Sequence, residues 1–138
     1  MRTEGMTLLE ILAIIIIIGI LAAIALPNFA PVREKALDKE ASASLKLIQA
    51  AEKIYRLETD FYYPYSTGTP VTETDITKIN QNLKLNLPTD DTSRKWSYSC
   101  KSTGGGACGD ATRYSGPDSR KWYLQVSGSE PVSGATCP

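Results

Sequence analysis

The sequence predicts an α+β fold in which a long N-terminal helix packs against a small antiparallel sheet. Three observations indicate this class: an uninterrupted apolar run, an amphipathic stretch after it, and alternating residues beyond Pro88. We therefore expect a polar leader over residues 1–5, an apolar helix over 6–26, its amphipathic continuation over 27–58 and a globular head over 59–138.

Composition excludes several classes of function. The 138 residues include 15 basic and 15 acidic side chains, so the formal net charge is zero and no nucleic-acid partner is expected. The chain has no His, and no group of carboxylates, Tyr, Lys or Cys replaces it as a catalytic constellation. We expect no enzymatic activity and no cofactor. Three Cys without His also make a zinc site improbable.

The apolar run over residues 6–26 has 21 residues and a single charge. A helix of that length spans about 31 Å, close to the ~30 Å core of a bilayer. A buried core helix is disfavoured, because the remaining chain is too small to enclose it. A cleaved secretory signal would suit Ala23-Ile24-Ala25, but the run is too long and contains Glu10, which costs roughly 3 kcal/mol at membrane depth. The third interpretation, a retained membrane or filament helix, is favoured.

The residues around Gly5 carry a family resemblance. Gly5-Met6-Thr7-Leu8-Leu9-Glu10, followed by an apolar run with Gly19 and then Pro27, resembles the class III signal of type IV pilins and pseudopilins. The resemblance implies that prepilin peptidase cuts after Gly5 and that the new Met6 amine is methylated. It also implies a single-pass precursor in the inner membrane, held by lipid, which an inner-membrane assembly platform builds into a helical homo-oligomer outside the cell or in the periplasm.

Glu10 has a physical role once the leader is removed. Cleavage creates an ammonium group on Met6, and in an apolar filament core that cation and the Glu10 carboxylate each need a counter-ion. The resemblance implies that the two groups pair between neighbouring subunits. The alternative is that Glu10 only extends to the cytoplasmic interface.

Gly19 and Pro27 predict a weak point in the apolar helix. Pro27 removes a backbone donor and opposes the carbonyl of Ala23, while Gly19 lowers helix propensity. The resemblance implies that this stretch melts when subunits leave the membrane. A passive kink at the membrane boundary remains an equal alternative.

From Val32 to about Glu58 the pattern is amphipathic. Small or apolar residues recur at helical spacing, at Ala43/Ser44, Leu47/Ile48, Ala50/Ala51 and Ile54/Tyr55. Charged residues lie largely off this stripe, at Arg33, Glu34, Lys46, Glu52 and Lys53. Glu52 and Arg56 have the spacing of an i,i+4 ion pair. We expect the stripe to be the spine of the head, in preference to the seam of a coiled-coil dimer.

The head should contain short elements on this spine. The aromatic residues in Phe61-Tyr62-Tyr63-Pro64-Tyr65 are expected to cover the helix end. Thr74 or Asp75 should cap a short helix over 76–83. Strands are expected around Trp96 to Cys100, more weakly over 111–115, and around Trp122 to Val126, with a turn over 116–119.

The three cysteines allow three disulfide pairings. Cys100 and Cys108 bracket residues 101–107, whose three glycines are expected to form a tight loop, so this pairing is favoured. Cys108 with Cys137 is the main alternative, since the resemblance implies that pilins often fix the C-terminal loop there. The scattered aspartates are interpreted as turn residues and not as the calcium-binding loop of major pseudopilins; they are Asp90, Asp91, Asp110 and Asp118.

Three functions remain open. The favoured one is a structural subunit of a type IV pilus-like filament. The first alternative is a pseudopilin of a type II secretion system, and the second is a signal-anchored or secreted binding domain that does not polymerise. The apolar segment and Glu10 favour the first two over the third, and the cysteines together with the absence of a recognisable calcium-binding loop favour the pilus over the pseudopilus.

Overall fold

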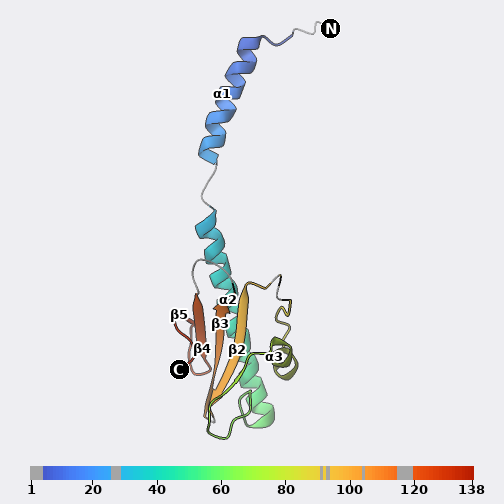
Figure 1. The fold of residues 1–138 in the computed structure, drawn as a ribbon, viewed down its shortest axis with the longest axis vertical. Helices are drawn as coiled ribbons and strands as arrows, with labels where there is room; N and C mark the ends of the chain where they lie inside the picture. Colours follow the sequence, from blue (N-terminus) through green and yellow to red (C-terminus); the bar gives the residue numbers. More distant parts are fainter. Residues whose placement is uncertain (1–4, 26–28, 91, 93, 104, 115–119) are drawn as a thin grey trace. The chain divides into compact units, whose positions relative to one another are not determined.

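The computed structural model describes residues 5–25, 29–90, 92, 94–103, 105–114 and 120–138. The chain divides into two units between residues 34 and 35, and each is described by itself. The elements, in chain order, are α1 (Leu8–Ala25), α2 (Ala30–Thr59), β1 (Val71–Glu73), α3 (Ile76–Leu83), β2 (Trp96–Thr103), β3 (Gly106–Arg113), β4 (Lys121–Gln125) and β5 (Val132–Ser133). The expected α+β class is confirmed (Figure 1).

The long N-terminal helix is present as two helices, α1 and α2. Phe29 belongs to neither, and residues 26–28 lie outside the described part of the chain. Thr7 precedes α1 and its backbone carbonyl accepts a hydrogen bond from the Glu10 N–H at 3.1 Å. The Thr7 hydroxyl lies 3.4 Å from the same N–H, so Thr7 occupies the N-terminal capping position of α1.

The five strands form one antiparallel sheet in the order β1-β2-β3-β4-β5 (Figure 1). Each strand pairs with its neighbour in sequence, as expected when short connections join antiparallel strands. The predicted strands at Trp96 and Trp122 are confirmed as β2 and β4. The weaker predicted strand is β3, which begins at Gly106 and is longer than expected. The predicted turn over 116–119 lies outside the described residues.

The expected glycine loop over residues 101–107 is wrong. Residues 101–103 continue β2, residues 106 and 107 begin β3, and the two strands form a hairpin in which Thr103 pairs with Gly106. The alternation of side chains from Trp96 onward continues to Thr103, because backbone pairing with β3 stabilises the extended chain.

One face of the sheet packs against α2. The apolar residues of the inward face of α2 are Ala41, Leu45, Ile48 and Ala51, all buried. Gly109 on β3 lies under this face: a Cβ atom placed on it would be 3.2 Å from Ile48 Cγ2 and 3.3 Å from Leu45 Cδ2. The absence of a side chain at Gly109 therefore lets the helix approach the central strand closely.

Two further contacts fix the head. Trp96 is fully buried, and its indole Nε1 donates a hydrogen bond to the Leu37 carbonyl of α2 at 3.1 Å. The predicted short helix is confirmed as α3, capped by the Asp75 carboxylate, which accepts hydrogen bonds from the backbone N–H groups of Thr77 and Lys78.

We predict that Gly109→Ala destabilises the head by about 1–3 kcal/mol, the usual cost of overpacking. This exceeds the gain of about 0.4–1 kcal/mol that replacing Gly brings through the unfolded state. Urea unfolding of the full chain in detergent micelles, followed by tryptophan fluorescence, measures the change. Gly106→Ala in the same strand is the control, because its Cβ would meet only Thr103 Oγ1 at 3.9 Å. Equal stability of the two variants would contradict the close helix approach.

Candidate functional site

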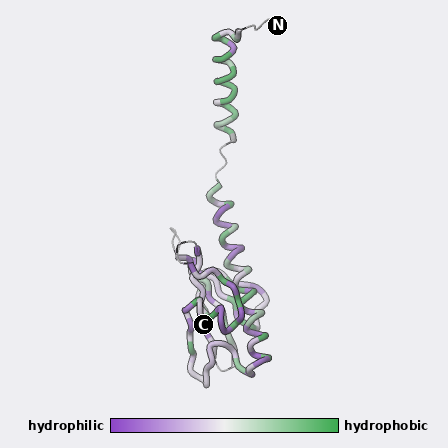
Figure 2. Tube along the Cα trace, turned by 90° about the vertical axis from the view of Figure 1, so that its right-hand side faces the viewer, coloured by the Kyte–Doolittle hydropathy of each residue, from purple (hydrophilic) through white to green (hydrophobic). Residues whose placement is uncertain are grey.

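The first candidate region is α1, which has no apolar partner among the described residues of its own unit. Its large apolar side chains are exposed from Leu8, at 85%, to Ile24, at 78%, and the least exposed, Ile14, still has 40% of its surface open. Figure 2 shows hydrophobic residues around the whole helix, in contrast to the mixed colours of α2. Monomeric proteins rarely expose apolar surface of this extent, so α1 requires a partner surface.

The predicted processing and assembly residues lie at the start of α1. Gly5 and Met6 precede the helix and are exposed, and Glu10 lies in its first turn. Glu10 forms no ion pair with another described residue. Gly19 is helical and exposed within α1, and Pro27 lies outside the described residues. The predicted apolar segment has 21 residues, whereas α1 has 18.

No helix among the described residues is both long enough and apolar enough to cross a membrane.

The second candidate region is the disulfide of the head, which joins Cys108 to Cys137 with their Cα atoms 5.9 Å apart. The favoured pairing of Cys100 with Cys108 is wrong, and Cys100 is a buried free thiol. The register of the hairpin gives the reason. Cys100 lies opposite Gly109, under α2, whereas Cys108 lies opposite Lys101. Neighbouring residues of a strand point to opposite faces, so Cys100 and Cys108 are on different sides of the sheet.

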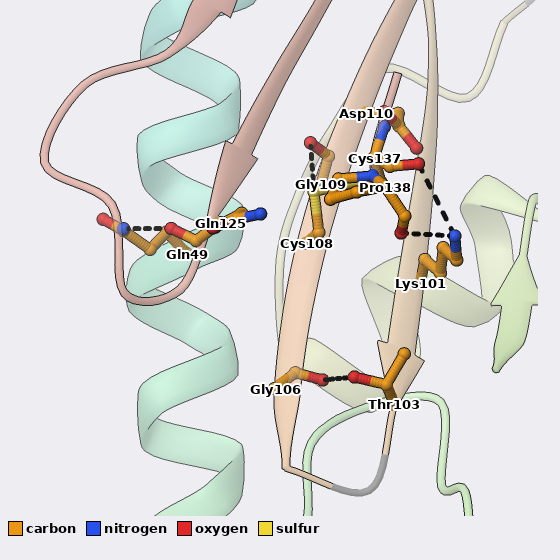
Figure 3. Close-up of a disulfide and its surroundings, with 10 residues drawn as sticks. All are labelled: Gln49, Lys101, Thr103, Gly106, Cys108, Gly109, Asp110, Gln125, Cys137 and Pro138. Carbon is orange, nitrogen blue, oxygen red and sulfur yellow. Dashed lines mark hydrogen bonds between the residues drawn. A yellow bond between two sulfur atoms is a disulfide. The ribbon is translucent and has the colours of Figure 1, made fainter. Parts of the chain in front are cut away.

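The face of the sheet opposite α2 holds the segment around Cys137 through three side chains (Figure 3). Cys108 bonds to Cys137, the Asp110 carboxylate accepts a hydrogen bond from the Cys137 N–H at 2.6 Å, and the Lys101 ammonium donates to the carbonyls of Cys137 and Pro138. Burial raises the pKa of Asp110, an effect that the Cys137 N–H opposes. These contacts cover the outer face of β3.

Among the described residues, Cys108, Asp110 and Cys137 lie close enough together to suggest metal ligands. Both sulfurs are in the disulfide, and a metal would require them as thiolates. The turn interpretation of Asp90 fits its contacts, since its carboxylate accepts hydrogen bonds from the N–H and hydroxyl of Thr92. For Asp110 the turn interpretation is wrong, because this residue lies within β3. Asp91 and Asp118 lie outside the described residues.

The third candidate region surrounds Glu52, for which the prediction from sequence is wrong. Glu52 was expected off the apolar stripe and paired with Arg56, but it is 1% exposed within the inward face of α2. Its Oε2 accepts a hydrogen bond from the Tyr63 N–H at 2.9 Å, while Oε1 has no hydrogen-bond partner among the described residues. The Arg56 guanidinium instead lies 4.7 Å from the centre of the Tyr62 ring.

Burial raises the pKa of Glu52 to about 7, although the Tyr63 N–H favours the carboxylate. Burial likewise raises the pKa of the Cys100 thiol well above its ordinary value, with the charge of Glu52 as the next cause. Cys100 is therefore a poor nucleophile. The sequence held a signal for Glu52, because Leu45, Ile48 and Glu52 follow the i, i+3, i+7 spacing of one helix face.

The aromatic segment after α2 is fixed to the head by polar contacts. Tyr63 is buried and packs edge-on against Tyr55, with ring centres 5.8 Å apart. The Tyr63–Pro64 peptide is cis, and the Pro64 carbonyl accepts a hydrogen bond from the buried Ser102 hydroxyl. Together with the contact between Glu52 and Tyr63, this fixes the segment across the end of α2, as expected for residues that cover the helix end.

We predict that the stability of the head falls between about pH 5 and 8 as Glu52 loses its proton. Because folding raises the pKa of Glu52 from 4.5 to about 7, its contribution is complete below pH 4.5 and is lost as the pH rises through 7. Glu52→Gln removes this titration, so its free energy of unfolding should depend less steeply on pH.

The control is Glu130→Gln, which removes an exposed carboxylate paired with Lys46 at 2.8 Å. Urea titrations of the three full-length proteins at several pH values give the slopes. Burial also raises the pKa of Asp110 above its ordinary value of 3.8, so part of the slope at the acid end will remain in Glu52→Gln. Identical slopes for the wild type and Glu52→Gln would contradict the assignment.

Comparison with known proteins identifies relatives over part of the chain. The type IV major pilin protein PilA of Myxococcus xanthus is 40% identical over 65 residues, which are 47% of this chain and 30% of that protein. The type II secretion system core protein G is 36% identical in Aeromonas hydrophila, over 44% of this chain and 43% of that protein. The same protein of Escherichia coli is 36% identical, with coverages of 49% and 46%.

The chain spans less than half the length of these curated relatives. No family model matches it, and no solved structure does. The resemblance expected from the residues between Gly5 and Pro27 is nevertheless confirmed: the curated homologues, over just under half of this chain, are a type IV major pilin and type II secretion pseudopilins.

Proposed function

We propose that this chain is a structural subunit of a type IV pilus-like filament, assembled through its N-terminal helix, and that it has no catalytic role. The observation that carries the proposal is α1, an apolar helix exposed on all sides with one acidic residue in its first turn. Such a surface is stable only against lipid or against similar helices. The relatives named above support the same role.

Processing prepares α1 for the membrane and for the filament. Prepilin peptidase cuts after Gly5, and the new amine of Met6 is methylated. The apolar residues 6–26 hold each subunit in the inner membrane until the assembly platform transfers them to the filament. There the helices of neighbouring copies replace lipid as the apolar surroundings, outside the cell or in the periplasm.

Glu10 sets the register of this assembly. Its carboxylate has no partner among the described residues, and burial without a cation would be costly. The Met6 ammonium of a neighbouring subunit supplies that cation. Pairing two buried charges adds little net stability but excludes positions in which either charge is left alone.

Gly19 and Pro27 supply the flexibility that transfer from membrane to filament requires. Gly19 lies in the middle of α1, where it weakens the helix by about 1 kcal/mol relative to Ala. Pro27 lacks the N–H that would continue the hydrogen bonds beyond α1. The helix therefore melts locally between these residues as subunits pack together.

A pseudopilin of a type II secretion system is the second candidate. Several relatives are core protein G of such systems, which favours this candidate. The matched segment is 43% and 46% of the length of two of those proteins, but 30% of the length of the pilin. Filaments on the cell surface support the pilus, whereas loss of secreted folded proteins on deletion, without surface filaments, supports the pseudopilin.

We predict that the mature protein begins at Met6 with a methylated amine. Intact-mass and N-terminal sequencing of the protein from its own cells measure both features. A start at Leu26, after Ala23-Ile24-Ala25, would instead show conventional secretion of the non-polymerising alternative and would overturn the filament proposal.

We predict that Glu10→Leu abolishes normal filaments while leaving the head folded, because the Met6 ammonium then has no counter-ion. Electron microscopy and sheared-filament yield measure assembly, and a protease-resistance assay of membranes reports the folded head. Ile14→Leu is the control, since it changes a side chain of α1 without changing charge. A wild-type yield of filaments from Glu10→Leu would contradict the pairing of Glu10 with the Met6 ammonium.

A further inference from the structure

The disulfide of the head has a carboxylate beside it. The side-chain oxygen of Asp110 and the sulfur atoms of Cys108 and Cys137 all lie within 4.8 Å of one another (Figure 3). These three residues are nearly enclosed, since only 8% of Cys108, 9% of Asp110 and 9% of Cys137 is exposed. Little water is present around them to screen the carboxylate, so its charge acts on the two sulfurs at short range.

Contacts with the C-terminal segment fix the Asp110 carboxylate in this place. It accepts a hydrogen bond from the Cys137 N–H at 2.6 Å, which joins it to one of the two cysteines. Burial raises the pKa of Asp110, whereas this N–H and the Lys101 charge favour the ionised form. The Lys101 ammonium itself donates hydrogen bonds to the carbonyls of Cys137 and Pro138. The disulfide therefore has fixed charges of both signs in its surroundings.

A cavity of about 230 Å³ adjoins the same disulfide. Of the described residues that line it, Cys108 is the only cysteine and Lys101 the only one with a charged side chain. A small reagent in this cavity therefore meets Cys108 without unfolding of the head. The free thiol of Cys100 lies on the other side of the sheet, so it cannot take the place of such a reagent.

Reduction of a disulfide by a thiol begins when a thiolate attacks one of the two sulfurs. A thiolate that attacks Cys108 forms a mixed disulfide with it, and the electron pair of the broken bond leaves on the sulfur of Cys137. The Cys137 thiolate then takes a proton from water. Negative charge lies on the three sulfurs throughout this exchange, so a fixed anion nearby raises the barrier and a fixed cation lowers it.

We infer that the Asp110 carboxylate protects the disulfide between Cys108 and Cys137 from reduction by thiolates, and that it does so through its charge. The carboxylate repels the incoming thiolate and disfavours the negative charge that leaves on Cys137. Lys101 acts in the opposite sense, but its ammonium is bound to two carbonyl groups. Reduction would free the segment that covers the outer face of β3, so this protection preserves the head whether or not the subunits form filaments.

The first test measures how fast dithiothreitol reduces the disulfide of the full chain in detergent micelles, with the released thiols alkylated and counted by mass spectrometry. Asp110→Asn removes the charge but keeps an oxygen that can accept the hydrogen bond from the Cys137 N–H. We expect this variant to raise the rate constant about tenfold. Asp60→Asn, the same change at an exposed residue after α2, should leave the rate constant unchanged. Equal rate constants for Asp110→Asn and the wild type would overturn the inference.

A loosened segment around Cys137 would also speed reduction, so the second test changes the charge of the reagent. Tris(hydroxypropyl)phosphine is an uncharged nucleophile that reduces disulfides without a thiolate. Because no anion approaches Asp110, we expect Asp110→Asn to change the rate constant with the phosphine by less than about threefold. An equal increase with dithiothreitol and with the phosphine would show that the substitution only loosens the segment, and would overturn the inference.

The third test removes the opposite charge. Lys101→Gln should slow reduction by dithiothreitol, although it also weakens the contacts with Cys137 and Pro138, and Lys53→Gln on the exposed side of α2 is the control. Faster reduction of Lys101→Gln would show that both residues act only by holding the segment in place, which would overturn the inference. A rate that does not depend on the dithiothreitol concentration would do the same, because reduction would then follow unfolding of the head.

Discussion

The close packing of α2 on strand β3 is the contact on which the rest of the head depends. Gly109 lets Leu45 and Ile48 approach the central strand, and these side chains lie with Trp96 in the hydrophobic core. The same contact decides which side of α2 is buried. Since one helix face is used by the sheet, the apolar side chains of Leu47, Ile54 and Leu57 on α2 are left exposed.

The face of β3 opposite α2 is covered in a different way. No helix among the described residues covers this face; the segment around Cys137 does, held by Cys108, Asp110 and Lys101. A small sheet with a helix on one side buries little apolar area, so a covalent link adds stability that side-chain packing does not supply. Gln49 has a related role on α2, because its amide donates hydrogen bonds to the carbonyls of Gln125, Val126 and Gly128.

Two glutamates belong to otherwise apolar segments, and their carboxylates differ in burial and in partners. Glu52 is buried inside the head, where a backbone N–H partly compensates its desolvation and its pKa rises. Glu10 is exposed on α1 and has no ion-pair partner among the described residues. The first carboxylate accepts one hydrogen bond within its own chain and fixes the aromatic segment, whereas the proposed function gives the second a cation from a neighbouring subunit.

The sequence by itself determined the features that depend on local pattern: the apolar and amphipathic helices, a helix cap at Thr74 or Asp75, the alternation in β2 and β4, and the signal around Gly5 and Glu10. Only the tertiary structure decided which partners those elements found. The pairing of Cys108 with Cys137, the burial of Glu52 and the division of α2 into a buried and an exposed face all depend on hairpin register and on which helix face meets the sheet. Local propensity does not encode these choices, because each depends on residues distant in the chain.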